Sequence, residues 1–254
     1  MILEFLSPGP ALLVSNEIKV LAVADLHLGI ESDLDRHGLH FRSRTKERRE
    51  RLEACIRETG PDLLLLLGDL KHEIPFTSRQ EHREIPEFVD QLRSLVPLRL
   101  MPGNHDIGIE RFLEKDEVLA KEGAVIDGTG YVHGHMYPAG CLAGRLIIAG
   151  HHHPMVCIRD EVGCALRSPA YLFSPLNEAC IGFPADQGDM ESSRVLFMPS
   201  FNELTGYDIM RTVKEPFSPL SRCMSPGEAE VLLPDGTFLG PLKALEGYEP
   251  NPES

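Results

Sequence analysis

Residues 18–27 have the sequence IKVLAVADLH, and residues 62–72 have the sequence DLLLLLGDLKH. Each stretch contains a nearly continuous apolar run, which is typical of a β-strand covered on both faces. Each run is followed by an aspartate and a histidine. Burying Asp69 directly after five leucines would be costly unless its carboxylate were paired or bound to a metal ion. We therefore expect polar groups to gather where these two strands end.

Outward from these stretches, strand-like and helix-like segments alternate through the first half of the chain. The sequence predicts strands at residues 18–24, 62–67 and 98–101, and helices at residues 43–59, 87–96 and 109–122. This βαβαβ order favours a mostly parallel sheet. Beyond residue 124, short strand candidates follow one another without helices, which favours a second, more antiparallel sheet. They are residues 124–126, 130–132, 146–149, 155–158, 164–167 and 195–198. We expect an α/β fold in which two mixed sheets face each other with helices outside, an α-β-β-α sandwich.

Size and composition set further limits. The 254 residues suit one domain over residues 1–254, with residues 245–254 as a loose acidic tail. No apolar run approaches the length of a membrane span, and the N-terminus lacks the basic start of a signal peptide. We therefore expect a cytoplasmic location and no membrane partner. The net charge of −14 would repel a long nucleic-acid duplex unless basic residues were locally concentrated.

The six cysteines are scattered and form no C-x-x-C pair. In a cytoplasmic chain of this size, we expect them to be small buried hydrophobic residues and not members of a disulfide framework or zinc site. They are Cys55, Cys141, Cys157, Cys164, Cys180 and Cys223.

Five polar segments each follow a predicted strand, where open α/β sheets bind their ligands. They are residues 25–27 (DLH), 68–72 (GDLKH), 103–106 (GNHD), 133–135 (HGH) and 150–153 (GHHH). Residues two apart on an extended chain point the same way, so His151 and His153 share a direction and His152 faces elsewhere. Such pairs can hold one ion, or two ions ~3.5–4 Å apart. Histidine nitrogen combined with carboxylate and amide oxygen suits manganese, iron, cobalt, nickel or zinc better than calcium or magnesium.

In this order, the motifs D-x-H, G-D-x-x-H, G-N-H-D, H-G-H and G-H-x-H resemble those of the calcineurin-like metallophosphoesterase superfamily. DLHLG and GDLKH resemble in particular the branch of the SbcD-type DNA-repair nucleases and their small stand-alone relatives, which include the DNA-ligase-associated phosphoesterases. The motifs span residues 25–153, and beyond them only residues 199–201 (PSF) and Gly206 are similar to the family.

The resemblance implies two divalent transition-metal ions bridged by Asp69. We take manganese as the first choice, with iron, cobalt, nickel and zinc as alternatives. The other ligands of the first ion would be Asp25, His27 and His153. The other ligands of the second ion would be Asn104, His133 and His151, with His135 as the alternative to His133.

The resemblance also implies the catalytic groups. His105 would be the general acid, Asp106 would orient His105, and His72 would lie near the phosphate. Two cations lower the pKa of a bridging water, so that a hydroxide attacks the phosphorus. We therefore expect hydrolysis of phosphate esters, phosphodiesters foremost, in a small ester, a nucleotide or a nucleic-acid end.

Two other functions compete with this one. An SbcD-like DNA nuclease is disfavoured by the net charge and by the absence of the extra length that those enzymes use for DNA binding. A non-catalytic metal-binding scaffold would show replaced ligands, and none is replaced here. We expect His37, His40 and His82 on the surface. The basic run at residues 42–51 is either a solvated helix face or a device that steers phosphodiesters towards the metal ions.

Overall fold

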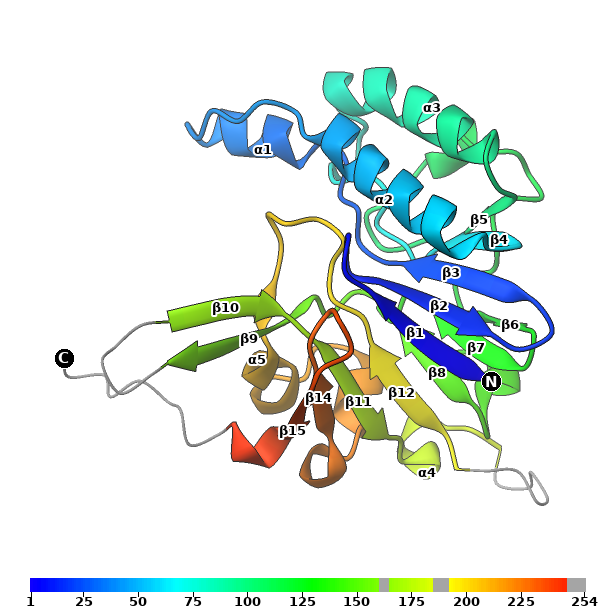
Figure 1. The fold of residues 1–254 in the computed structure, drawn as a ribbon, viewed down its shortest axis with the longest axis vertical. Helices are drawn as coiled ribbons and strands as arrows, with labels where there is room; N and C mark the ends of the chain where they lie inside the picture. The colour runs from blue at the N-terminus through cyan, green and yellow to red at the C-terminus, as the bar shows by residue number, and fades with distance from the viewer. Residues whose placement is uncertain (160–164, 185–191, 246–254) are drawn as a thin grey trace.

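The computed structural model describes residues 1–159, 165–184 and 192–245, and its two facing mixed sheets confirm the predicted α/β fold (Figure 1). The first sheet has the strand order β1 (Ile2–Leu6), β2 (Ala11–Ser15), β3 (Lys19–Val23), β4 (Leu63–Leu66) and β5 (Leu98–Leu100). Strands β3, β4 and β5 are parallel, as expected. The hairpin of β1 and β2, which extends this sheet antiparallel to β3, was not predicted.

The second sheet has the strand order β15 (Phe238–Pro241), β14 (Glu230–Leu232), β11 (Tyr171–Pro175), β12 (Arg194–Phe197), β8 (Leu146–Ala149), β7 (Thr129–Val132) and β6 (Ala124–Ile126). Strand β8 is parallel to both β7 and β12, whereas the outer pairs are antiparallel. A small third sheet has the order β10 (Ala165–Pro169), β9 (Pro154–Arg159) and β13 (Tyr207–Asp208). Cys164, the first residue of one expected strand, and residues 246–254 of the expected tail lie outside the described residues.

Successive side chains of the buried strands point to opposite faces of their sheet, so they contribute to two separate layers of the core. Val20 and Ala22 of β3 point between the two sheets, while Leu21 and Val23 point towards the helices. The layer between the sheets is completed from the other side by Tyr131, Ile148, Tyr171, Leu196 and Met198. An unbroken apolar run was therefore a correct sign of a strand that is covered on both faces.

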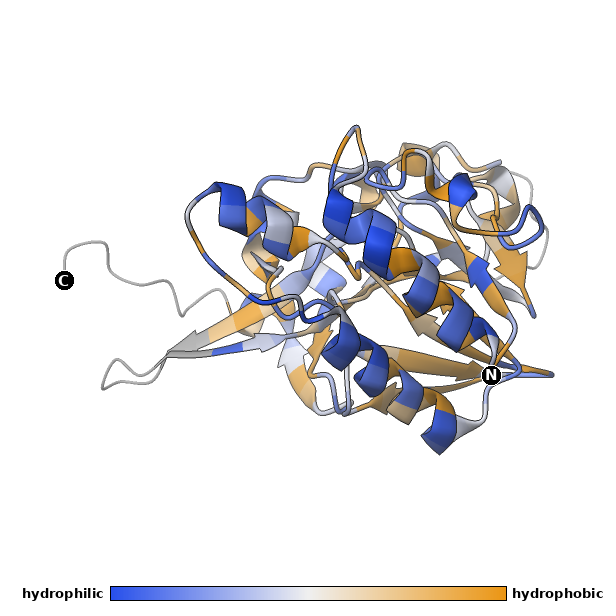
Figure 2. Cartoon of the chain, turned by 90° about the horizontal axis from the view of Figure 1, so that it is seen from above, coloured by the Kyte–Doolittle hydropathy of each residue, from blue (hydrophilic) through white to orange (hydrophobic). Residues whose placement is uncertain are grey.

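Helices cover the outer faces of the two sheets. They are α1 (Ile30–Arg36), α2 (Thr45–Thr59), α3 (Arg79–Arg93), α4 (Glu178–Ile181), α5 (Ile209–Lys214) and α6 (Pro219–Cys223), with short 3₁₀ turns at Ile109–Arg111, Gly140–Leu142, Pro226–Glu228 and Leu242–Ala244. The apolar side chains of α2 and α3 pack on the first sheet, and those of α4, α5 and α6 pack on the second. Figure 2 shows the hydrophilic residues, in blue, along the exposed sides of the long helices.

Two helix predictions need correction. The helix expected at residues 87–96 begins earlier, because Ser78 and Glu81 form a capping box at the start of α3. The helix expected at residues 109–122 is wrong beyond its first turn. The chain there lies beside β5, where Leu100 N donates to Glu117 O and Leu119 N donates to Leu100 O. Backbone pairing with the sheet edge thus prevails over the local helix propensity.

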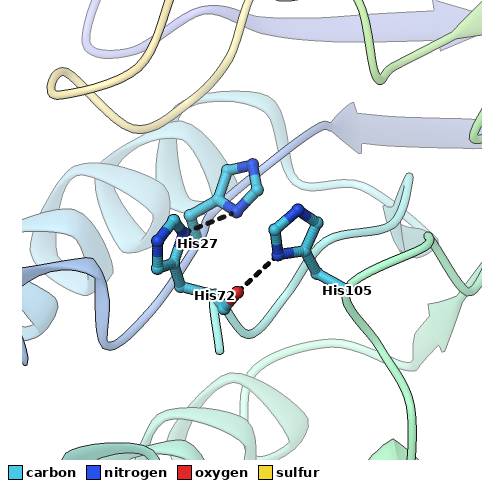
Figure 3. A group of neighbouring side chains, drawn as sticks. All are labelled: His27, His72 and His105. Atoms are coloured by element: carbon cyan, nitrogen blue, oxygen red, sulfur yellow. Dashed lines mark hydrogen bonds between the residues drawn. The ribbon is translucent and has the colours of Figure 1, made fainter. Parts of the chain in front are cut away.

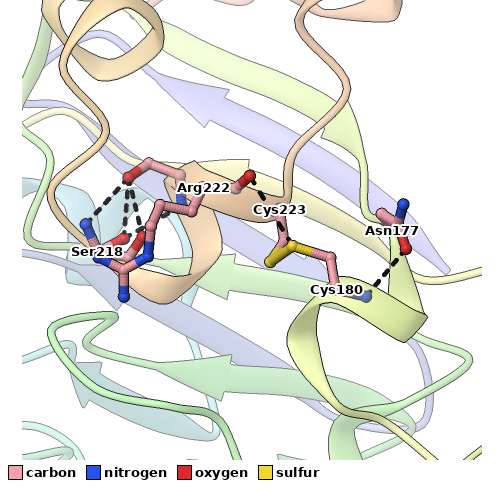
Figure 4. The surroundings of a disulfide bond; sticks show 6 residues. Asn177, Cys180, Ser218, Arg222 and Cys223 are labelled. Carbon is pink, nitrogen blue, oxygen red and sulfur yellow. Dashed lines mark hydrogen bonds between the residues drawn. A yellow bond between two sulfur atoms is a disulfide. The ribbon is translucent and has the colours of Figure 1, made fainter.

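The cysteine prediction is also wrong for one pair. Cys180 of α4 and Cys223 of α6 form a disulfide with a Cα–Cα distance of 5.5 Å (Figure 4). The fold brings two short helices together from positions 43 residues apart, a proximity that spacing alone could not reveal. Among the described residues, Cys55, Cys141 and Cys157 are free. Cys55 is buried as expected, whereas Cys141 is exposed and Cys157 is only partly buried, contrary to the prediction.

In the described part of the chain, no helix is both long enough and apolar enough to cross a membrane.

Candidate metal centre

The five polar segments converge at one edge of the two facing sheets. Residues 25–27, 68–72 and 103–106 follow the parallel strands β3, β4 and β5, while residues 133–135 and 150–153 follow β7 and β8. Backbone hydrogen bonds join the first two segments, because Asp25 N donates to Gly68 O and His27 N donates to Asp69 O. The strand ends therefore bring together side chains that lie more than a hundred residues apart in the sequence.

The backbone is strained at this edge. Among the described residues, six non-glycine residues have positive φ, and five of them are proposed ligands. They are Asp25 (58°), His27 (43°), Asp69 (49°), His151 (70°) and His153 (43°). Each such conformation costs on the order of 1–3 kcal/mol and persists only where the surroundings enforce it. The concentration of strain at these positions makes them candidates for a functional site.

Asp69 lies where two groups of possible ligands meet. One group joins it to Asp25, His27 and His153, and the other joins it to His133 and His151. In each group, one ligand atom per residue lies within 4.8 Å of all the others. Asn104 reaches the second group, because its Oδ1 lies 3.2 Å from His133 Nε2. All seven residues proposed as metal ligands are therefore brought together, with Asp69 shared between the groups.

Several polar atoms in the first group are buried without a hydrogen-bond partner. They are Asp25 Oδ1, His27 Nε2 and both ring nitrogens of His153. Asp25 Oδ1 and His153 Nε2 lie 3.1 Å apart but do not form a hydrogen bond. Buried polar atoms are normally paired, and leaving one unpaired costs ~1–3 kcal/mol. Imidazole and carboxylate groups that converge without pairing fit a divalent cation of the transition series.

Electrostatics favour the forms that bind a cation. Burial alone would raise the pKa of Asp69, but the nearby His133, His27 and His105 outweigh it and hold that pKa well below its usual range. Burial lowers the pKa of His27 strongly and that of His151 to about 2, so both imidazoles are neutral and able to ligate. Burial would lower the pKa of His133 too, but Asp69 outweighs it and raises that pKa to about 9. A cation bound beside His133 would replace this proton.

The structure separates the two histidines of the HGH segment. His133 is fully buried, its Nε2 lies 3.5 Å from Asp69 Oδ2, and its Nδ1 donates to Leu67 O at 2.9 Å. That second contact fixes the ring orientation, as is usual for a metal-bound histidine. His135 stands 5.2 Å from His133, measured between ring centroids, and belongs to neither ligand group. The geometry supports His133 over His135.

The three histidines of Figure 3 line the mouth of the centre. His72 Nδ1 lies 3.3 Å from His27 Nδ1, and its Nε2 lies 3.6 Å from Asp33 Oδ2 on α1. His105 Nδ1 contacts the backbone carbonyl of His72, which leaves its Nε2 for other partners. The proposed acid and the proposed phosphate neighbour therefore lie side by side, with a centroid separation of 5.5 Å.

Asp106 differs from its expected role of orienting His105. Its carboxylate accepts hydrogen bonds from Gly103 N at 2.8 Å and Lys71 N at 3.3 Å, so it ties the GNHD turn to the segment after Asp69. The carbonyl of His72 orients His105 instead. Burial, reinforced by the charge of Asp69, raises the pKa of Asp106 to about 6.

The segment after β12, which the sequence motifs hardly indicated, holds the D-x-H turn by hydrogen bonds. Ser200 Oγ donates to Asp25 O at 2.7 Å, and Asn202 Nδ2 donates to Leu26 O at 2.8 Å. Both side chains are buried. These bonds hold the strained turn of Asp25 and His27 in place, which gives a physical role to the faint resemblance at residues 199–201.

The basic run of residues 42–51 does not face the centre. Arg48 is fully buried on α2 and pairs with Glu31 at 2.8 Å and with Glu203 at 3.0 Å. Arg44 and Arg51 also pair with Glu203. These arginines hold α2 against the loop that follows β12, so steering of phosphodiesters by this run is not supported. His37, His40 and His82 are exposed, as expected.

A pocket of about 500 Å³ opens over the centre. Its lining includes proposed ligands together with His72 and His105. It also includes a wall of Tyr207, Arg211 and Phe217, in which the ring of Tyr207 packs against His153 and that of Phe217 against His151. Arg211 is the one lysine or arginine among the described residues that line this pocket, and its guanidinium carbon lies 4.7 Å from the centre of the Tyr207 ring. Sequence reasoning missed this wall, because an isolated tyrosine, arginine and phenylalanine carry no recognisable motif.

Comparisons with known proteins agree with the geometry. Residues 18–160 match the calcineurin-like phosphoesterase family. The crystal structure of Pseudomonas putida nuclease MPE superimposes with a TM-score of 0.55 at 19% sequence identity, covering 91% of this chain and 91% of that chain. Yfce, a phosphoesterase from E. coli, has a TM-score of 0.42 at 12% identity, covering 87% of this chain and 96% of that chain. At these identities the structural likeness concerns the fold alone.

A substitution at Gly103 tests how closely the residues around Asp69 are packed. A Cβ atom there would lie 2.1 Å from Asp69 Oδ1 and 2.5 Å from Asp69 N. Gly103→Ala should therefore displace Asp69, abolish retention of metal after dialysis and destabilise the fold by ~1–3 kcal/mol. Elemental analysis and thermal unfolding measure both effects. Gly227→Ala is the control, because its Cβ would meet nothing within 4 Å. Wild-type metal content in Gly103→Ala would contradict the described packing.

Proposed function

The chain belongs to the calcineurin-like phosphoesterase family, and we propose that it hydrolyses phosphodiesters with two divalent metal ions bridged by Asp69. The observation that carries this proposal is the position of Asp69, which is shared by two ligand groups within the described residues. A single ion would occupy only one of these groups and leave the other without a metal ion.

Asp25, His27, Asp69 and His153 would hold the first ion, and Asp69, Asn104, His133 and His151 would hold the second. When bound, the two ions would supply a nucleophilic water near neutral pH and positive charge for the phosphoryl oxygens. We propose manganese as the native metal, because the ligands combine imidazole nitrogen with carboxylate and amide oxygen.

His105 is proposed as the general acid. Its Nδ1 contacts the carbonyl of His72, which can only accept, so the proton on Nδ1 is fixed and Nε2 faces other partners. A protonated Nε2 at the pocket wall can give its proton to the leaving oxygen. His72, which lines the same pocket, is placed to contact a phosphoryl oxygen.

The aromatic wall of the pocket, formed by Tyr207 and Phe217, supports a diester substrate. A phosphomonoester would fill only the metal side, whereas Tyr207 and Phe217 offer partly exposed rings to a second organic group. Phe217 lies 5.3 Å from His151 and Tyr207 lies 5.6 Å from His153, measured between ring centroids. These short separations place the rings within reach of a flat group attached to a phosphate at the centre, and a nucleobase fits this description. Arg211 adds a positive charge for a further phosphate.

The two competing functions fit the same residues less well. An SbcD-like nuclease acting on long DNA would need a basic approach, yet no residue of the basic run lines the pocket, and Arg44, Arg48 and Arg51 pair with Glu203. Nucleic-acid ends remain within the proposed substrate class. A non-catalytic scaffold would not need His105 at the pocket wall. The cytoplasmic location stays a prediction, and the Cys180–Cys223 disulfide weighs against it because cytosolic disulfides are rare.

The catalytic proposal is tested at Asp69. Asp69→Asn keeps the shape of the side chain but removes the bridging charge, so manganese-dependent hydrolysis of bis-p-nitrophenyl phosphate should fall by at least about a hundredfold. Asp127→Asn is the matched control, since Asp127 also has positive φ but lies away from the centre, where it accepts from Glu17 N and Ile18 N. Full turnover by Asp69→Asn would defeat the proposal.

The diester wall is tested with two substrates that release the same p-nitrophenolate. One is the thymidine 5′-ester of p-nitrophenyl phosphate and the other is methyl p-nitrophenyl phosphate. At manganese concentrations that saturate each variant, Phe217→Ala should lower kcat/KM for the nucleoside ester about tenfold, because stacking of one base contributes ~1–3 kcal/mol, and should spare the methyl ester. Phe238→Ala is the control, an exposed aromatic change on β15. Equal losses for both esters would refute a role of the wall in substrate choice.

A further inference from the structure

His152 lies between two proposed ligands and is itself fully buried. Its Nδ1 contacts Gly150 O at 2.9 Å, and its Nε2 contacts Ser218 Oγ at 2.8 Å. A carbonyl oxygen can only accept, so Nδ1 donates to Gly150. Ser218 Oγ accepts from Ser221 N at 3.1 Å, and its own hydrogen can go to His152 Nε2 at 2.8 Å or to Ser221 Oγ at 3.2 Å, of which Nε2 is the nearer acceptor. Both polar ends of the ring are therefore satisfied by fixed partners.

Aromatic side chains hold the same ring from the sides. The His152 ring centroid lies 4.3 Å from that of Phe197 on β12 and 4.9 Å from that of Phe217. Phe197 is fully buried in the second sheet. The imidazole is thus immobilised between the sheet and the segment that leads into α6.

The neighbouring residues need this restraint. His151 and His153 have φ values of 70° and 43°, and His152 N donates to Gly150 O at 2.8 Å within the same tight turn. Two left-handed residues that flank a single residue are unfavourable in an unrestrained chain. If His152 is fixed, the turn has one conformation, and its two outer imidazoles keep their directions towards the two ligand groups.

Helix α6 is the other half of the restraint. Ser218 is its N-cap and forms a capping box with Ser221, while Cys223 at its opposite end is bonded to Cys180 of α4 (Figure 4). The capping box therefore fixes Ser218 at the start of the helix, and the disulfide fixes the end of the same helix. The contact between Ser218 and His152 joins this anchored helix to the metal-binding turn.

We propose that His152 and Ser218 are positioning residues that set metal affinity by holding the turn of residues 150–153 in its strained conformation. This inference rests on the proposed metal centre. Neither residue belongs to a ligand group, and neither lines the pocket. Their effect passes through His151 and His153.

The test compares two alanine substitutions in one capping box. Ser218→Ala removes the hydroxyl from His152 as well as the cap, whereas Ser221→Ala disturbs the cap but keeps the Ser218 hydroxyl on His152. Loss of a hydrogen-bond partner outside the ligand set typically weakens metal binding ~10- to 100-fold, and Ser218 acts on the proposed ligands through His152. Ser218→Ala should weaken manganese binding by this factor, measured by electron paramagnetic resonance of free Mn²⁺. Ser221→Ala should bind like the wild type.

Two further readouts separate positioning from general destabilisation. Ser218→Thr keeps a hydroxyl and should restore manganese affinity. In metal-free protein, hydrogen exchange at the His152 amide should accelerate in Ser218→Ala and not in Ser221→Ala.

Unchanged manganese affinity in Ser218→Ala, or an equal loss in Ser221→Ala, would overturn the inference while leaving the metal centre intact. A wild-type protein that binds no manganese, cobalt or zinc would overturn the proposed function, and the positioning role with it.

Discussion

The buried negative charge of Asp69 is the constraint on which the rest of the site depends. It follows five consecutive leucines and is only 2% exposed, in surroundings that oppose a charge. Imidazoles on both sides keep its pKa low, and the two ligand groups share its carboxylate. The ends of β3, β4, β7 and β8 therefore have to meet around it, since a charge in this position is stable only when cations or cationic groups compensate it.

Holding these groups in place requires strained backbone, and the fold supplies the restraint. Gly103 leaves the space that Asp69 occupies, and Ser200 and Asn202 hold the D-x-H turn from the opposite sheet. His152 and Ser218 do the same for the last turn. Residues outside the two ligand groups thus hold the directions of the residues within them. This division is expected where a preorganised site is built on loops at the ends of rigid strands.

The sequence predicted most strands of the two large sheets and the five polar segments that follow strands, because those signals are local. An apolar run of five residues that ends at Asp or Gly marks both a strand and its functional end. It could not predict features that depend on distant partners. The segment after Ile109 pairs with the edge of β5 instead of forming a long helix, and Cys180 meets Cys223 only through the packing of α4 against α6. The wall of Tyr207, Arg211 and Phe217 could not be predicted for the same reason, and neither could the hydrogen bonds of Asp106 to Gly103 and Lys71.

The central claim is that one carboxylate bridges two ions, and anomalous diffraction tests it most directly. Crystals containing manganese, measured on both sides of the manganese absorption edge, should show two anomalous peaks ~3.5–4 Å apart. Both peaks should contact Asp69, with His27 and His153 at one and His133 and His151 at the other. A single peak at saturating manganese, or two peaks that do not share Asp69, would contradict the account.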